Sequence, residues 1–249
     1  MGRIRNADIG ATMVAQSIHE ESEAQKHKLG ERLVLGDRVF RYAKAGAALD
    51  QGFLLESAEL GGALTTAQID LAVAAAAVGD KTITVTTLTT AQTVNRFAEG
   101  YASIVSDTNA HGAGVAYKIR SHPVQSAAGA LVLTLYDEVH KAITTDCKVS
   151  LCTSLYYAVK QTADSTAVGM PMGVSLIDVQ SAYFFWAQTW GPAAVLTGSN
   201  AIVDSAIIRG LEDGESDIQG TAGITPEIGY AIEAGADGDF PLMFLRIAP

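Results

Sequence analysis

Apolar and polar residues alternate in short runs along most of the chain, and turn residues separate these runs. Residues 82–86 alternate with a period of two, which predicts a half-buried β-strand. Residues 32–35 and 38–45 flank Gly36 and Asp37, and this arrangement predicts a hairpin whose second strand alternates basic and apolar side chains. Short strands at intervals of about 8–12 residues, with turns between them, are typical of a sandwich or barrel.

The remaining runs extend this pattern to the end of the chain. Further strands are predicted at 53–57, 101–105, 115–120, 131–135, 148–152, 155–159, 174–177, 178–190, 193–197, 201–204, 206–209, 227–233 and 240–247. Asp213–Gly214 and Asp237–Gly238 are strong hairpin signals between apolar runs. Residues 66–77 are the exception, because their apolar positions fit a short helix as well as continuous burial. The sequence therefore predicts a mainly β protein with short-stranded antiparallel sandwich or barrel regions.

The most aromatic stretch, residues 178–192, contains both tryptophans and ends at Gly191–Pro192. Aromatic and β-branched residues in a short run predict a buried or half-buried strand, and the Gly-Pro pair predicts its end. Because Trp186 and Trp190 are four residues apart, we expect them on one face of the strand. The candidates for core packing or for a subunit interface are Tyr183, Phe185, Trp186 and Trp190. A platform that stacks on sugars or bases is a further interpretation of the two tryptophans.

Differences in hydrophobic periodicity and polarity along the chain predict three segments. Within residues 1–30, the first half has no clear period and residues 16–28 are polar all round, so a short helix there could not bury a face of its own. We expect residues 1–30 to form an extended N-terminal arm that orders on a partner, with a frayed terminus as the alternative. Residues 31–160 are expected to form a β-rich domain, and residues 161–249 a small acidic β-barrel.

The net charge of −10 is unevenly distributed. Lys and Arg number four against four Asp and Glu in residues 1–30, eleven against twelve in residues 31–160, and two against eleven in residues 161–249. This acidic last segment argues against a protein that wraps nucleic acid. It is explained either by solubility alone or by a last segment that faces solvent while the earlier part docks on a partner. The hydrophobic content of 48% supplies a core and argues against general disorder.

The two cysteines and the ends of the chain bear on where the protein is made. Cys147 and Cys152 are five residues apart in a strand-like run, so their side chains are expected on opposite faces, without a disulfide, as in a reducing compartment. No apolar run reaches the roughly 18–20 residues of a membrane helix. Residues 1–5 lack the apolar core of a signal peptide. We therefore expect a soluble protein made in a cytoplasm.

Motifs that carry chemistry are mostly missing from the sequence. There is no Walker loop, no dinucleotide fingerprint and no nucleophile elbow, and the five histidines show no zinc-type spacing. Residues 213–217 resemble the opening of a calcium loop, but Ile218 stands where that loop needs glycine and Ile224 where it needs glutamate. The acidic residues around this turn are better explained as a solvated surface. We expect no enzymatic activity, no cofactor and no metal.

Three patches of the sequence resemble one known family. Residues 35–52 (LGDRVFRYAKAGAALDQG) resemble the opening of capsid decoration, or cement, proteins of tailed bacteriophages. Gly173–Val174 leading to residues 183–192 (YFFWAQTWGP), followed by residues 229–238 (GYAIEAGADG), is similar to the later part of the same proteins. Together the patches span most of residues 31–249.

The resemblance implies a β-rich virion protein, commonly trimeric, that sits on the outer surface of the phage head and bridges neighbouring major capsid subunits. The expected partners are the major capsid protein and further copies of this chain, with neither nucleic acid nor membrane. Residues 1–30 and the basic side chains Arg38, Arg41 and Lys44 are the candidates for shell binding. The alternatives are another virion component, such as a head fibre, tail or baseplate protein, and a carbohydrate-binding β module.

Overall fold

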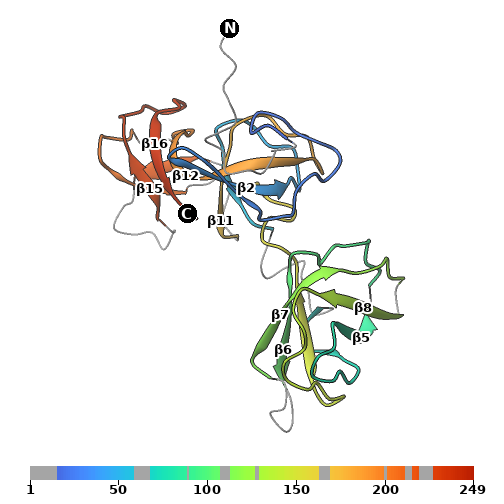
Figure 1. The fold of residues 1–249 in the computed structure, drawn as a ribbon. Coiled ribbons are helices and arrows are strands. Elements are labelled where there is room, and N and C mark those ends of the chain that lie inside the picture. Colours follow the sequence, from blue (N-terminus) through green and yellow to red (C-terminus); the bar gives the residue numbers. More distant parts are fainter. Residues whose placement is uncertain are drawn as a thin grey trace. The chain divides into compact units, whose positions relative to one another are not determined.

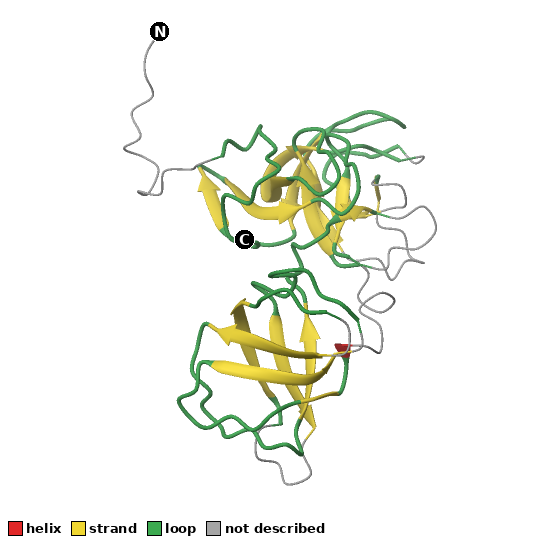
Figure 2. Ribbon diagram, turned by 90° about the vertical axis from the view of Figure 1, so that its right-hand side faces the viewer, coloured by secondary structure: helices red, strands yellow, loops and turns green. Residues whose placement is uncertain are grey.

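The computed structural model describes residues 16–58, 68–88, 90–106, 113–126, 129–162, 169–198, 201–210, 215–218 and 227–249. The described residues form strands and loops with almost no helix, which confirms the mainly β fold (Figure 2). The chain divides into two compact units: unit 1 consists of Met1–Ala58 and Leu155–Pro249, and unit 2 of Glu59–Ser154. Unit 2 is therefore an insertion into unit 1 along the sequence.

These two units differ from the expected division into segments 1–30, 31–160 and 161–249. The strand Arg38–Lys44 pairs with the strand Phe184–Ala194, so segments that were expected in two domains share one sheet. Hydrophobic patterning reports which residues are buried but not which distant strand they meet, and an inserted unit is therefore hard to recognise from it.

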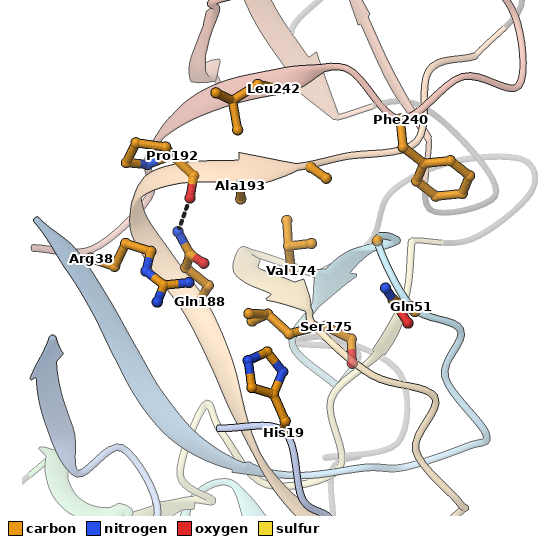
Figure 3. Close-up of a pocket in the computed structure, with 13 residues that line it drawn as sticks. His19, Arg38, Gln51, Val174, Ser175, Gln188, Pro192, Ala193, Phe240 and Leu242 are labelled. Carbon is orange, nitrogen blue, oxygen red and sulfur yellow. Dashed lines mark hydrogen bonds between the residues drawn. The ribbon is translucent and has the colours of Figure 1, made fainter. Parts of the chain in front are cut away.

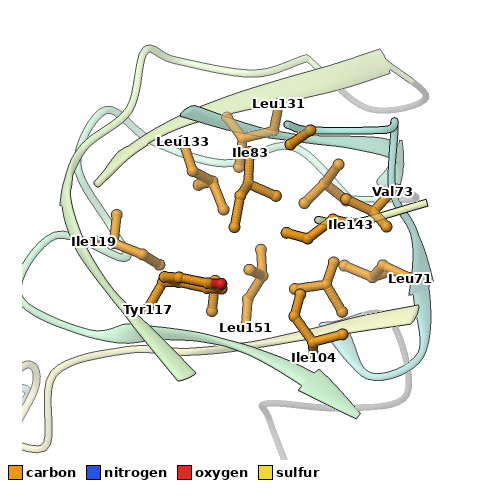
Figure 4. Packing of buried hydrophobic residues seen from close by; sticks show 14 of the residues in the cluster. Leu71, Val73, Ile83, Ile104, Tyr117, Ile119, Leu131, Leu133, Ile143 and Leu151 are labelled. Carbon is orange, nitrogen blue, oxygen red and sulfur yellow. The ribbon is translucent and has the colours of Figure 1, made fainter. Parts of the chain in front are cut away.

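Unit 2 is a curled antiparallel sheet of six strands. These are β4 (Leu71–Ala72), β5 (Thr82–Leu88), β6 (Tyr101–Ser106), β7 (Val115–Ser121), β8 (Gly129–Leu135) and β9 (Lys148–Cys152), in the order β4-β9-β6-β7-β8-β5. A bridge between Val73 and Val85 joins the two ends of this order. The alternating apolar side chains of the strands point inward and form one buried cluster (Figure 4).

The helix considered for residues 66–77 is wrong over its described part. Leu71 and Ala72 form β4, and Val73 and Ala76 make isolated bridges to Val85 and Ile143. Leu71, Val73 and Ala76 are all buried. Ala75 and Ala77, in contrast, are exposed, so neither the helix nor continuous burial describes this segment, which is extended and turns only some of its apolar side chains into the core. Cys147, also buried in this unit, and the half-buried Cys152 are free thiols, as expected.

Unit 1 contains a sheet of ten strands. They are β1 (Arg32–Leu35), β2 (Arg38–Lys44), β3 (Leu54–Glu56), β10 (Lys160–Gln161), β11 (Pro171–Ser175), β12 (Phe184–Ala194), β13 (Ile207–Gly210), β14 (Ser216–Ile218), β15 (Glu227–Ala231) and β16 (Leu242–Arg246). The main path is β10-β3-β11-β12-β16-β15-β13-β14, and β1 and β2 branch from β12 (Figure 1). The predicted hairpin at Gly36 and Asp37 is confirmed, because Leu35 pairs with Arg38.

The long strand β12 changes its partner halfway along one edge. Gln188 pairs with Phe40 of β2 on one side and with Val174 of β11 on the other. Trp190 again pairs with β2 on one side, but on the other side it meets Arg246 of β16. Strands β11 and β16 therefore follow one another along the same edge of β12. The expected stop at Gly191–Pro192 is wrong, because the pairing with β16 carries the strand through these residues to Ala194.

The segment 16–30 is packed onto unit 1 and does not extend from it as an arm. Ile18 and Leu29 are buried in a cluster with Phe40, Tyr42 and Trp186. A bridge joins Ser22 to Phe184 at the start of β12. The segment is mostly polar, so its sequence alone did not indicate that Ile18 and Leu29 would be buried. Their burial requires the aromatic side chains of the sheet. The first part of the expected arm, residues 1–15, lies outside the described residues.

One turn recurs through both units. A residue in an isolated bridge is followed, three positions later, by a residue with positive φ. The bridge residues are Leu49, Ala76, Gln92, Val179, Ile202 and Gly235, and the matching positive-φ residues are Gly52, Gly79, Asn95, Ala182, Ser205 and Gly238. The left-handed conformation favours glycine, so Ala182 (φ 69°) and Ser205 (φ 63°) hold it at a cost in free energy.

Candidate functional site

The three basic side chains expected to bind a shell do not share one face of β2. Side chains alternate along a strand, so Arg38 and Lys44 lie on the face of Phe40 and Tyr42, whereas Arg41 lies on the other face. All three basic residues are half-buried. The regular alternation of basic and apolar residues assumed from the sequence is replaced by a burial pattern with a period of three.

Each of these side chains has contacts of its own. The guanidinium of Arg38 lies 5.4 Å from the ring centre of Phe40. The Lys44 ammonium lies over the rings of Tyr157 and Phe184, 5.2 and 5.4 Å from their centres. Arg41 donates hydrogen bonds to the main-chain oxygens of Gly30 (3.2 Å) and Pro249 (3.0 Å). Arg41 therefore connects two chain segments, whereas the Arg38 guanidinium makes no hydrogen bond to any of the described residues.

The four aromatic candidates have different environments. Phe185 and Trp186 are 0% and 1% exposed and lie in buried clusters on opposite faces of β12, so packing explains them. Tyr183 is half-buried against the same cluster as Phe185. Trp190 is half-buried, and its ring meets Phe244 edge-on, with centroids 5.7 Å apart.

The expectation that both tryptophans lie on one face is wrong. Trp186 pairs with Tyr42 and Trp190 pairs with Val39, three residues away on β2. The register shift between Gln188 and Trp190 marks a β-bulge, which inserts one extra residue and turns the following side chains to the other face. Composition and spacing alone do not locate such a bulge. A stacking platform that uses both tryptophans is therefore excluded.

An aromatic face is present on the second half of β12 and the strands beside it; we define it as Trp190, Tyr230 and Phe244. Tyr230 pairs with Phe244, and all three residues are half-buried. The exposed Arg246 lies over the Tyr230 ring at 5.3 Å and donates to the Tyr230 hydroxyl oxygen at 3.0 Å. Ile207, which pairs with Tyr230, is 40% exposed. Large apolar side chains therefore remain accessible on this face.

A cavity of about 560 Å³ lies in unit 1, where the partner of β12 changes from β11 to β16 (Figure 3). Its apolar lining comes from Val174, Leu176, Pro192, Ala193, Phe240 and Leu242, among others. Its polar lining comes from His19, Arg38, Gln51, Ser175 and Gln188. A mostly apolar cavity with a few polar groups at fixed positions is the usual form of a ligand site.

Gln188 occupies a distinctive position in the wall of this cavity. Its Nε2 donates hydrogen bonds to the main-chain oxygens of Trp190 (3.2 Å) and Pro192 (2.7 Å). Carbonyl oxygens only accept, so these two bonds fix which end of the amide is the nitrogen. The Gln188 Oε1 is buried and has no hydrogen-bond partner among the described residues, and in Figure 3 it faces the space that the lining residues surround.

The ionisable side chains that line the cavity are Arg38 and His19. Among the residues that the structure describes, no aspartate or glutamate lines it. Within the described parts of the chain, neither the Arg38 guanidinium nor the His19 ring makes a hydrogen bond. In a chain with 27 acidic residues, a cavity without a carboxylate favours an anionic group in its ligand.

Sequence reasoning did not identify His19 or Gln188 as site residues. Gln188 carried one recognisable signal, a lone amide side chain within a run of buried strand residues. His19 lies in the segment that was expected to form an arm. Neither residue could be placed near Arg38 without the pairing of β2 with β12.

The described residues contain no group of three or more His, Cys, Asp or Glu side chains that could hold a metal ion. Among them there is also no helix long and apolar enough to cross a membrane. Comparison of the chain with protein-family models, with curated proteins and with solved structures gives no match.

Proposed function

We propose that this chain is a structural virion protein that binds the outer surface of a tailed-phage head and stabilises the contacts between major capsid subunits. In this proposal the protein acts as a homotrimer. The weak contacts of the three copies then act together, because binding of one copy raises the effective concentration of the others at the shell. The resemblance of residues 35–52, 173–174 with 183–192, and 229–238 to capsid decoration proteins motivates it. The protein would be made in the cytoplasm of a bacterial host.

The observation that carries the proposal is the aromatic face. Trp, Tyr, Phe and Arg are the residue types most enriched in protein–protein interfaces, and Trp190, Tyr230, Phe244 and Arg246 gather on one side of a rigid sheet. Burying such a face against a protein surface removes apolar area from water and stabilises the contact. A face of this kind supports a binding protein more directly than an enzyme.

The proposal also accounts for the uneven distribution of charge along the chain. Residues 161–249 carry two basic against eleven acidic side chains. In the proposal, the acidic side chains of this part face solvent on the outside of the particle, where a high net charge favours solubility and discourages aggregation. The carbohydrate-binding alternative loses its basis, because the buried Trp186 cannot form a platform with Trp190.

The test uses a double variant of the aromatic face, Trp190→Ala with Phe244→Ala. The matched control is Tyr101→Ala, which removes a 48% exposed tyrosine from unit 2. Co-sedimentation with phage heads stripped of this chain measures binding, and light scattering coupled to size exclusion measures oligomeric state. Circular dichroism confirms that each variant is folded.

The proposal predicts that the double variant loses trimer formation, head binding, or both, by at least about tenfold in affinity, as expected when interface hot spots are truncated. The control should bind like the parent protein. Full binding and an unchanged mass for a folded double variant would remove the observation on which the proposal depends. Failure of the parent protein to bind heads at all would contradict the proposal itself.

A further inference from the structure

The cavity beside Gln188 is a second surface that the proposed function does not use. We infer that it binds the C-terminal residue of a polypeptide whose last side chain is apolar. Arg38 pairs with the terminal carboxylate, Gln188 accepts the last main-chain N–H, and the apolar lining holds the side chain. This inference stands independently of the virion role, because it depends only on the geometry of unit 1.

Arg38 supplies the group that recognises the carboxylate. Its guanidinium lines the cavity and lies 5.4 Å from the Phe40 ring centre, which supports the side chain from one side. A guanidinium matches the two oxygens of a carboxylate and can bind both at once. No acidic side chain of the described residues lines the cavity, so none of them repels an incoming carboxylate there.

Gln188 supplies the acceptor. Its Nε2 is held by the main-chain oxygens of Trp190 and Pro192, so the side chain cannot turn its amide over without losing both bonds. The remaining Oε1 is a buried acceptor without a partner, and such a group gains from any donor that reaches it. A main-chain N–H is a donor of the right kind.

The register of the sheet brings these two groups together. Gln188 lies opposite Phe40, and Arg38 is two residues further along β2 on the same face. Arg38 and Gln188 are therefore diagonal neighbours across two paired strands, within reach of long side chains. In a C-terminal residue, the carboxylate and the main-chain N–H are attached to the same Cα, and their close spacing matches this pair.

The rest of the cavity fits an apolar side chain and a departing chain. Val174 and Ala193 are buried parts of the lining, and Leu242 is half-buried. Phe240, which is 49% exposed, and the exposed Ala194 line the side that opens to solvent. A polypeptide whose last residue occupies the cavity can therefore continue into solvent along that side.

The test measures binding to the full-length chain by NMR titration of its amide resonances with four probes. N-acetyl-L-leucine carries the carboxylate, the N–H and the apolar side chain. N-acetyl-L-leucinamide lacks the carboxylate, and 4-methylpentanoate lacks the N–H. A tetrapeptide that ends in leucine with a free carboxylate represents a polypeptide terminus. We expect the tetrapeptide to bind at least as tightly as N-acetyl-L-leucine, and the other two probes to bind at least tenfold more weakly.

Two arginine variants separate recognition from general effects. Arg38→Gln should weaken N-acetyl-L-leucine binding at least tenfold, and Arg38→Lys should restore part of it. Arg41→Gln, on the other face of the same strand, is the matched control and should change binding less than twofold. Resonance shifts caused by N-acetyl-L-leucine should centre on Gln188 and Ala193.

Three results would overturn the inference. The first is no saturable binding of N-acetyl-L-leucine or the tetrapeptide. The second is equal binding of the amide and the acid, which would leave only an apolar cavity. The third is binding of N-acetyl-L-leucine with exclusion of the tetrapeptide, which would assign the cavity to a free small molecule instead of a chain terminus.

Discussion

Trp186 lies directly opposite Tyr42 on neighbouring strands, and the centroids of their rings are 5.0 Å apart. Both residues also hold Gln16 by hydrogen bonds. The Tyr42 hydroxyl donates to the Gln16 Oε1 at 2.7 Å, and the Trp186 Nε1 donates to the Gln16 main-chain oxygen at 3.1 Å. One aromatic pair in the sheet therefore anchors the segment that the sequence suggested would be an arm.

Tyr42→Phe should destabilise unit 1. The change removes the hydroxyl that donates to Gln16 and accepts from the Lys26 main-chain N–H, and it leaves a buried acceptor without its partner. We expect the free energy of unfolding to fall by about 1–3 kcal/mol. Urea denaturation followed by tryptophan fluorescence measures it, since both tryptophans belong to unit 1. Tyr183→Phe is the control, with an expected change within about 0.5 kcal/mol; similar losses in both variants would count against this network.

Two truncations should separate the packed segment from the residues before it. Deletion of residues 1–30 removes the buried Ile18 and Leu29, and each large apolar side chain is worth about 1.5–3 kcal/mol of burial. The free energy of unfolding should therefore fall by at least about 3 kcal/mol. Deletion of residues 1–15 keeps Gln16, Ile18 and Leu29, so it should lower stability less than the longer deletion does. Thermal unfolding distinguishes the two outcomes, and a stable 1–30 deletion would contradict the packing of this segment.

Left-handed backbone positions predict opposite effects for two substitutions in unit 1, one in the recurring turn and one in the hairpin turn between β1 and β2. Ala182 has a φ of 69° and Gly36 a φ of 64°, with nothing within 4 Å of a Cβ added to Gly36. Ala182→Gly relieves left-handed strain and should raise the free energy of unfolding by about 0.5–1 kcal/mol. Gly36→Ala introduces the same strain and should lower it by about 1 kcal/mol. Urea midpoints that move in the same direction would show that backbone conformation does not control these turns.

The pH dependence of unit 2 should involve His122. Its Nε2 accepts a hydrogen bond from the Phe97 main-chain N–H at 3.0 Å, and its Nδ1 lies 2.8 Å from the Pro123 oxygen, so the geometry assigns a neutral ring with the proton on Nδ1. Burial lowers the pKa of His122 below its usual value, against a smaller raising effect of the bond to Pro123. The unfolded chain therefore binds this proton more readily than the folded one.

It follows that the His122 contribution to stability is fully present above the unfolded pKa of about 6.5 and is lost as the pH falls from there toward the lower folded pKa. NMR titration of the histidine Cε1–H resonances should give His122 a midpoint below 6.5, and the resonances of Phe97 should shift with it. A midpoint at or above 6.5 would contradict the buried neutral ring.

Local patterns in the sequence predicted most strands of both units. The period of two at residues 82–86 lies within β5, and the turn at Gly36 and Asp37 connects β1 to β2. Each of these predictions depends on neighbouring residues, whose burial and turn geometry are written into the local sequence. The mainly β fold followed from such elements.

The features that depend on distant pairing could not be predicted in this way. Gly191–Pro192 reads as a stop, yet β12 continues because β16 provides a new partner there. The bulge beside Gln188 separates the faces of the two tryptophans, and the Gln188 Oε1 next to it has no hydrogen-bond partner among the described residues. The cavity depends on both features, so its residues are recognisable only once β2, β11 and β16 are placed around β12.

The central claim is that the chain is a structural component of a phage head, and its copy number in the particle tests this claim most directly. Quantitative peptide mass spectrometry of purified particles of the phage that encodes the chain would compare it with the major capsid protein. The account predicts a number of copies comparable to that of the capsid protein. A few copies per particle would place it at a tail or a vertex, and its absence from particles would contradict the structural role.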